Sequence, residues 1–134
     1  MSKLHKRIRR EEGFTLIELL IVLVILGILL AIAVPAYLGF KDRANNRAAE
    51  ADVRAAIPSA EAFYETNNTY SGLTTTALRA IDAGLSKNLT TVSSVTVSHY
   101  CLGASVGGKT WSVYGPGATG WYTSLNCTGA ATTP

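Results

Sequence analysis

The chain has 134 residues, with 12 Lys and Arg, 9 Asp and Glu, and a formal net charge of +3. This length allows one small globular domain plus a membrane segment and excludes a multidomain architecture. The basic excess lies in residues 1–13, which hold five of the 12 basic and two of the nine acidic residues. The remainder therefore carries seven residues of each sign, and its net charge of zero gives nucleic-acid binding no support.

An apolar run extends from Phe14 to Val34, and Glu18 is its only charged residue. As a helix rising about 1.5 Å per residue, this run is roughly 31 Å long, which matches the hydrocarbon core of a bilayer. The Lys and Arg residues before the run predict a cytoplasmic N-terminus, so the rest of the chain is expected to face outward. A carboxylate at mid-membrane costs about 2.5–3.5 kcal/mol on insertion scales, so Glu18 needs a compensating partner.

Two general explanations of this run are a signal anchor and a cleavable secretory signal. The segment Ala31-Ile32-Ala33 has the small-x-small pattern of a signal peptidase site. Against a secretory signal, the run is long, carries Glu18 early and continues with helix-compatible residues beyond Pro35. A signal anchor has no use for Glu18, so neither explanation accounts for the charge.

A third explanation considers the flanking residues as well. A basic leader precedes the segment Gly13-Phe14-Thr15-Leu16-Ile17-Glu18, and the aliphatic run then ends at Pro35. Together these features resemble the class III signal of type IV pilins and pseudopilins. The resemblance implies that residues 1–13 are a leader, which a prepilin peptidase cleaves between Gly13 and Phe14, and that Phe14 is then N-methylated. Two acids directly before the cleavage site, Glu11 and Glu12, depart from the pattern.

The resemblance also implies a role for Glu18 in assembly. Glu18 would face the new amino group of a neighbouring subunit. An ammonium group close to a carboxylate in a low-dielectric helix bundle offsets part of both desolvation costs. The spacing fits this role, because one helical turn separates positions 14 and 18.

The helix is expected to continue beyond the apolar segment 14–35. Pro35 removes a backbone donor and predicts a kink, and Pro58 predicts a second bend. Residues 36–66 are rich in Ala and charged residues, and their apolar positions recur every three or four residues. The resulting apolar stripe contains Ala49, Val53, Ile57, Ala60 and Tyr64. We expect one continuous helix of roughly 50 residues, with Arg47, Glu50, Arg54, Glu61 and Glu65 mostly on its other faces.

Residues 67–91 are expected to form the connection from helix to sheet. Short polar residues and Gly72 end the helix. A short helix is predicted over 77–83, capped by Thr75 or Thr76 and closed by Gly84. In type IV pilins the corresponding loop varies, and we find no chemistry in it here.

Residues 92–134 are predicted to form an antiparallel sheet of three or four strands. Alternating patterns mark strands at 95–101, 110–114 and 121–125, with 89–92 as a possible fourth. Gly107-Gly108 and Gly115-Pro116-Gly117 mark the turns. A face with Trp111, Val113 and either Trp121 or Tyr122 would cover the helical stripe. The expected fold is therefore α+β, a long N-terminal helical spine with the sheet packed on its outer half.

Cys101 and Cys127 both lie in this outward-facing part. Two cysteines in an extracytoplasmic domain predict one disulfide. In type IV pilins a C-terminal disulfide bounds the region most exposed on the filament, and this pair lies at the corresponding place. A metal site built from the two cysteines and His99 is the less favoured alternative, because it offers three ligands without close paired spacing.

No catalytic constellation is visible, so the chain is not predicted to be an enzyme and no cofactor is expected. The resemblance implies a structural subunit of a type IV pilus filament that polymerises through its N-terminal helix, for attachment, motility or DNA uptake. The implied partners are identical subunits, the prepilin peptidase, and the pilus assembly platform with its ATPases. The precursor would span the cytoplasmic (inner) membrane once, and the mature chain would form an extracellular filament on the cell surface.

Two alternatives remain. One is the major pseudopilin of a type II secretion system, although Asp82 is the only acid after Tyr70, which does not favour the calcium site more typical of that group. The other belongs to a different class, a monomeric membrane-anchored extracytoplasmic binding domain.

Overall fold

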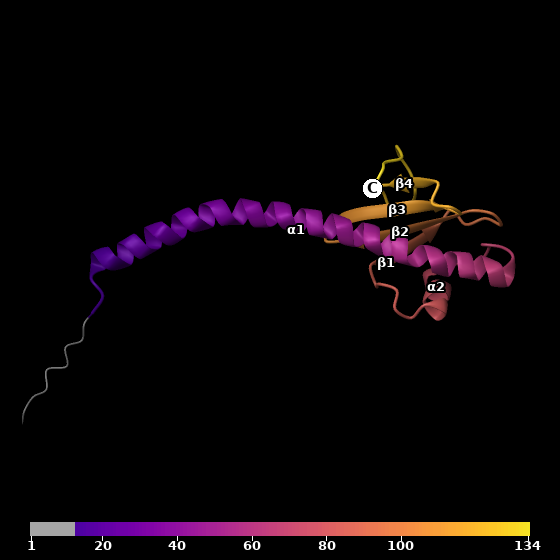
Figure 1. The fold of residues 1–134 in the computed structure, drawn as a ribbon, viewed down its shortest axis with the longest axis horizontal. Helices are drawn as coiled ribbons and strands as arrows, with labels where there is room; N and C mark the ends of the chain where they lie inside the picture. Colours follow the sequence, from indigo (N-terminus) through magenta and orange to yellow (C-terminus); the bar gives the residue numbers. More distant parts are fainter. Residues whose placement is uncertain (1–12) are drawn as a thin grey trace, which may run out of the picture. The chain divides into compact units, whose positions relative to one another are not determined.

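The computed structural model describes residues 13–134, so residues 1–12 of the expected leader lie outside the described part of the chain. The described residues form two helices and four strands (Figure 1). These elements are α1 (Leu16–Asn67), α2 (Thr75–Ile81), β1 (Leu89–Ser93), β2 (Tyr100–Val106), β3 (Lys109–Gly115) and β4 (Gly120–Tyr122). The chain divides into two units, the first ending at Leu38 and the second beginning at Gly39, and α1 contributes residues to both.

Helix α1 is a single helix of 52 residues, as the sequence predicted. It starts at Thr15, whose side-chain Oγ1 accepts a hydrogen bond from the backbone N–H of Glu18 at 3.2 Å. Its helical hydrogen bonding continues through Pro35 and Pro58. The kink at Pro35 stays a prediction.

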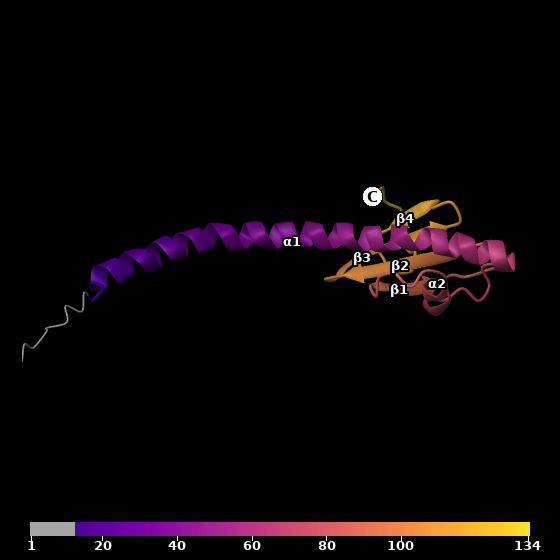
Figure 2. The ribbon, with the colours of Figure 1, turned by 60° about the horizontal axis from the view of Figure 1, so that its bottom comes forward.

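The second unit contains an antiparallel sheet with the strand order β1-β2-β3-β4. Its central pairing sets Leu102 opposite Val113 and Ala104 opposite Trp111. The turn between β2 and β3 contains Gly107 and Gly108, both with positive φ, as expected for this glycine pair. Within this unit, α1 lies across one face of the sheet and α2 lies beside β1 (Figure 2).

The core of the second unit lies between α1 and this face of the sheet. The fully buried helix residues are Ala49, Val53, Ala56 and Ala60. They pack in one cluster with buried side chains from the sheet, among them Leu102, Trp111, Val113 and Trp121. The predicted aromatic face is therefore confirmed with Trp121. In the helical stripe, Ile57 and Tyr64 are only partly buried, and Ala56 belongs to the buried side instead.

The first predicted strand was wrong in position. Residues 95–99 form a turn in which the side chain of Thr96 accepts the backbone N–H of His99 at 3.0 Å, and Val97 is exposed. The strand that follows, β2, is buried from Tyr100 to Ala104 without alternation. The alternating pattern failed because it detects strands with one solvated face. Both faces of β2 are covered.

Three other boundaries differ from the predictions. Helix α2 begins at Thr75, and its N-cap is Thr74, whose hydroxyl accepts the N–H of Ala77. It ends at Ile81, with Asp82 as the C-cap. Strand β4 contains three residues, and the strand at Leu89–Ser93 pairs with β2 as the fourth member of the sheet.

Candidate functional site

The apolar half of α1 is the first candidate site. Every residue from 13 to 44 is exposed, including long runs of Leu, Ile and Val. This part of α1 is long and apolar enough to cross a membrane. A helix that is apolar on all sides is stable only in lipid or inside a bundle of other helices. Because the described chain covers none of this surface, its stabilising contacts come from outside the chain.

The predicted cleavage site lies just before this helix. Gly13 and Phe14 precede α1, and the Phe14 side chain is 85% exposed. A Cβ atom at Gly13 would meet nothing within 4 Å among the described residues. Nothing in the described part of the chain therefore requires glycine here. An enzyme that must approach this peptide bond closely gives a physical reason for it, and cleavage and methylation stay predictions.

Glu18 occupies the first turn of α1. Its backbone N–H is bonded by the Thr15 side chain, and the backbone N–H of Leu19 donates to the Thr15 carbonyl at 3.2 Å. The described residues form three salt bridges, and none involves Glu18. Sequence reasoning overlooked Thr15 as the cap, although Thr15-x-x-Glu18 is a capping-box pattern. The Glu18 side chain has no cationic partner within residues 13–134.

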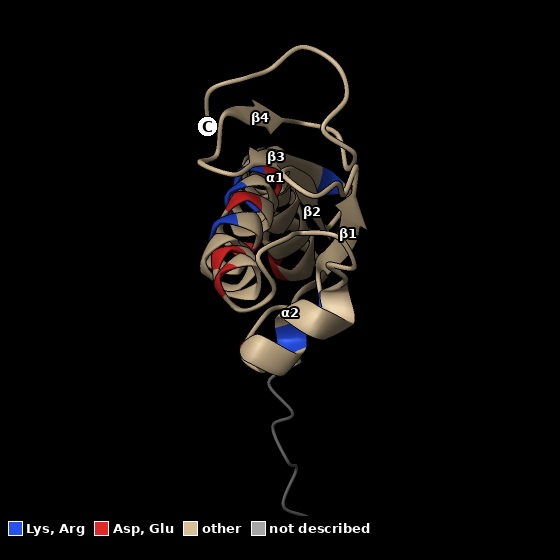
Figure 3. Cartoon of the chain, turned by 90° about the vertical axis from the view of Figure 1, so that its right-hand side faces the viewer, with Lys and Arg blue, Asp and Glu red and all other residues tan. Residues whose placement is uncertain are grey.

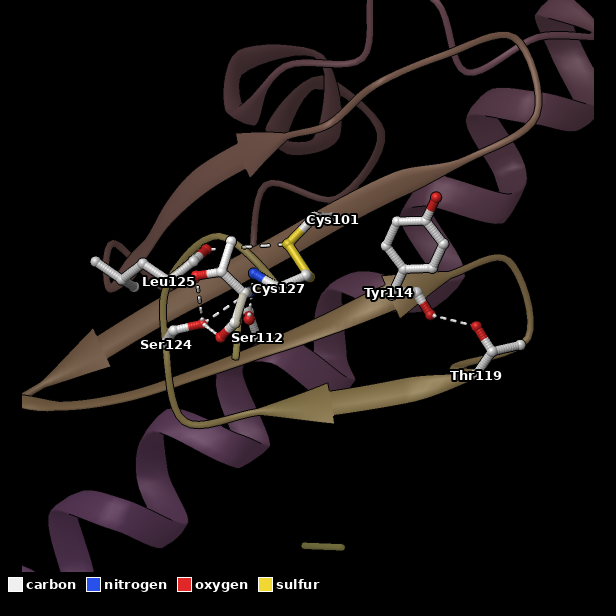
Figure 4. Close-up of a disulfide and its surroundings, with 8 residues drawn as sticks. Cys101, Ser112, Tyr114, Thr119, Ser124, Leu125 and Cys127 are labelled. Carbon is white, nitrogen blue, oxygen red and sulfur yellow. Dashed lines mark hydrogen bonds between the residues drawn. A yellow bond between two sulfur atoms is a disulfide. The ribbon is translucent and has the colours of Figure 1, made fainter. Parts of the chain in front are cut away.

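The disulfide between Cys101 and Cys127 is the second candidate site, and it is present as predicted (Figure 4). Cys101 lies on β2 and Cys127 lies in the segment after β4. Their Cα atoms are 6.0 Å apart. The bond therefore fixes the C-terminal segment against the face of the sheet that α1 leaves free.

Two small residues allow this segment to lie close to the sheet. The backbone N–H of Cys127 donates to the Oγ of buried Ser112 on β3 at 3.0 Å (Figure 4). A Cβ atom at Gly103 on β2 would overlap the carbonyl of Leu125. Sequence reasoning did not identify either residue. The available signal was the placement of small residues inside two otherwise bulky strands.

Polar contacts hold α1 on the sheet. The indole N–H of Trp111 donates to the side-chain oxygen of Asn46 at 2.9 Å. The guanidinium of Arg54 lies 4.5 Å from the ring centroid of Trp121, within the range of a cation–π interaction. These contacts pin both tryptophans to α1 in the second unit.

Glu50 is buried on α1, whereas the sequence placed it on a solvent-facing side. The Arg54 pair that the sequence suggested is formed at 2.9 Å, and Arg47 binds the other carboxylate oxygen, also at 2.9 Å. Burial by itself raises the pKa of Glu50, but the hydrogen bonds and charges of the two arginines outweigh burial and lower it. The carboxylate is thus stabilised in its charged form.

Glu61 is the second acid of α1 that faces the core. The hydroxyls of Tyr70 and Tyr100 each donate to one of its carboxylate oxygens at 2.7 Å. Burial, together with these hydrogen bonds and the nearby negative charge, raises the pKa of both tyrosines well above the usual value. Glu61 therefore links α1 to the start of β2 and to the connection that precedes α2.

No described feature indicates catalysis or metal binding. Residues 13–134 contain no group of three or more His, Cys, Asp and Glu side chains placed to hold a metal ion. The disulfide uses both cysteines of the weighed metal set. His99 contacts its neighbour Ser98 at 2.8 Å and stacks on Tyr114. The two structural features to explain are thus the uncovered apolar helix and the stapled head.

Comparison with known proteins addresses both features. Residues 8–34 match a family described as the prokaryotic N-terminal methylation motif. The chain is 36% identical over 108 residues to the type IV wide pilus major component PilA4 of Thermus thermophilus, covering 77% of this chain and 80% of that protein. No solved structure shows a significant match.

Shorter matches join the N-terminal part to two further groups. The chain is 38% identical over 76 residues to the type II secretion system core protein G of Vibrio cholerae, or 57% of this chain and 51% of that protein. It is 54% identical over 54 residues to the type IV narrow pilus major component PilA5 of Thermus thermophilus, 40% of this chain and 46% of that protein. Each shorter match thus spans about half of the relative.

Proposed function

Because the chain belongs to the type IV pilin and pseudopilin family, we propose that it is a structural subunit of a type IV pilus, polymerising through the apolar half of α1. The family consists of structural subunits. The observation that carries the proposal is the exposure of every residue from 13 to 38 on a helix without polar faces. In a polymer, the helices of other copies cover this surface.

Glu18 supplies the proposed specificity of this packing. Its carboxylate has no salt-bridge partner among the described residues. After cleavage behind Gly13, the amino group of Phe14 in a neighbouring copy would pair with it. Other axial offsets would leave the charge unpaired in an apolar core, so the pair would favour one register.

The proposed life cycle follows from the same segment. The precursor would span the cytoplasmic membrane once with its N-terminus inside, lose residues 1–13 to a prepilin peptidase and receive an N-methyl group on Phe14. The assembly platform and its ATPases would then transfer the chain into an extracellular filament. No cofactor or catalytic role is proposed.

The second candidate is the major pseudopilin of a type II secretion system, because several relatives are core protein G. The match to PilA4 favours the pilus, since it spans 108 residues and must extend into the second unit. Electron microscopy distinguishes the candidates: a pilus subunit gives long surface filaments, whereas deletion of a pseudopilin gene abolishes protein secretion.

Glu18→Ala provides the mechanistic test. We expect this variant to insert into the membrane at least as well as the parent, to be processed, and to give few filaments. Intact mass spectrometry should show loss of residues 1–13 and gain of one methyl group in the parent filament. Normal filament numbers in Glu18→Ala would overturn the proposed role of Glu18, and an unprocessed chain in filaments would overturn the processing step.

A further inference from the structure

The charges of the second unit are separated along α1. Figure 3 shows most of the acidic and basic residues on this helix and few on the sheet. Four basic residues lie between positions 41 and 54, namely Lys41, Arg43, Arg47 and Arg54. From position 55 to the end of α1, the charged residues are Glu61 and Glu65. The helix therefore has a basic region followed by an acidic one.

Two of these charges have no opposite charge within the described residues. The salt bridges there use Arg47, Arg54 and Lys109 as their basic members. The guanidinium of Arg43 bonds only a backbone carbonyl one turn earlier in its own helix, at 3.3 Å. Exposed Glu65 forms none of the salt bridges or side-chain hydrogen bonds found in residues 13–134. An external partner is available to both side chains.

The spacing of these two residues sets a geometric condition. Arg43 and Glu65 are 22 residues apart on one continuous helix, which is roughly six turns and 33 Å. They therefore lie on the same side of α1 but cannot meet within one chain. In a second copy with its helix parallel and shifted by this distance, Arg43 would lie level with Glu65 of the first.

The same shift brings together a large and a small surface. Phe40 is 67% exposed on α1 and has no place in the core cluster. A shift of 22 residues puts it level with Ala62, and Pro58 lies one turn earlier on the same side. Small side chains there let a neighbouring helix approach closely. The position thus offers Phe40 an apolar surface that its own chain does not supply.

We propose that in the polymer the segment from Pro58 to Glu65 of one copy packs on the segment from Phe40 to Ala44 of a second copy. The helices lie parallel, with Glu65 bound to Arg43 and Phe40 against Ala62. This inference rests on the proposed filament function and adds a second contact between copies. The Glu18 contact joins positions four residues apart, so it links a different pair of neighbours along the same polymer.

The charge pair is tested by reversal. Glu65→Arg and Arg43→Glu each place like charges together, and we expect each to reduce surface filaments by roughly tenfold or more. The double variant restores opposite charges and should recover most of the parental number. Normal filaments in both single variants would overturn the proposal, and so would a double variant no better than the worse single one.

The apolar contact has a matched control. Phe40→Ala should also reduce filaments, whereas Val97→Ala, at a side chain of nearly equal exposure in the head, should not. Both purified full-length variants, held in detergent, should keep the parental unfolding temperature, because neither side chain is buried in one chain. Equal filament numbers in the two variants would contradict the contact. Absence of filaments in the parent would instead reject the proposed function.

Discussion

The two units of the chain treat apolar residues in opposite ways. In residues 13–38 every side chain is exposed, and Leu, Ile and Val cover all sides of the helix. In residues 39–134 the large apolar side chains gather in one buried cluster between α1 and the sheet. The first unit has no tertiary core of its own, so lipid or other copies must satisfy it. The second is held by its own packing, and mutations should separate the two behaviours.

The largest expected effect on this comparison comes from the disulfide. Cys101 and Cys127 are 26 residues apart, and a loop of this size predicts about 3.5 kcal/mol of stabilisation in the chain-entropy model. Changing both to Ser should lower the unfolding temperature of the head in the detergent-solubilised chain. The helical signal of residues 16–38 should remain. Parallel loss of both signals would show that the two units are not independent.

A matched pair of leucines tests the comparison directly. Leu102 is fully buried on β2, whereas Leu26 is exposed on α1. Leu102→Ala should destabilise the head by about 2–5 kcal/mol through lost burial and the cavity left behind. Leu26→Ala should leave the unfolding midpoint of the head unchanged. Denaturant titration followed by tryptophan fluorescence measures both, and similar losses in the two variants would refute the division.

The tyrosine contacts of Glu61 should have a smaller effect. Tyr100→Phe removes one of two hydroxyls that donate to this carboxylate, which should cost about 1–3 kcal/mol, the usual range for a bond to a charged group. Tyr114→Phe is the control, because its hydroxyl donates no hydrogen bond within residues 13–134. Equal unfolding temperatures for the two variants would show that Glu61 does not need this donor.

The smallest expected effect is a pH dependence. The pKa of Glu50 is lowered in the folded chain from its ordinary value of 4.5, so the stabilisation is complete above that value and is lost as pH falls through the folded pKa. Glu50→Gln should flatten the decline in head stability below about pH 5 by roughly 1 kcal/mol, since both arginines are largely exposed. Exposed Glu65→Gln should not. The urea midpoint measured across this range compares them.

The difference between the units also explains which features the sequence predicted. The first part of α1 follows from composition alone, because an apolar segment of this length has few structural solutions. The cysteine pair was predictable because only two cysteines are present. Strand β2 was misplaced because its two faces are covered by segments far apart in sequence, α1 and the residues around Leu125.

Contacts between distant segments account for the other omissions. Glu50 and Glu61 have the residue type of a solvated helix face, and only the folded chain shows the two arginines and two tyrosines around them. Gly103 shows the same limit. Its absent side chain matters because a carbonyl approaches it from 22 residues later in the chain, and no local pattern records that approach.

The staple in the head also limits how far a subunit can lengthen under tension. Strands β3 and β4 and most of β2 lie inside the covalent ring that Cys101 and Cys127 close. When force acts between α1 and the C-terminus, the load passes through the sulfur atoms, and the backbone inside the ring cannot be drawn out. At about 3.3–3.6 Å per extended residue, the 26-residue separation withholds roughly 85–95 Å of contour length. A pulled subunit whose sheet had opened would still keep this slack locked away until the disulfide was reduced.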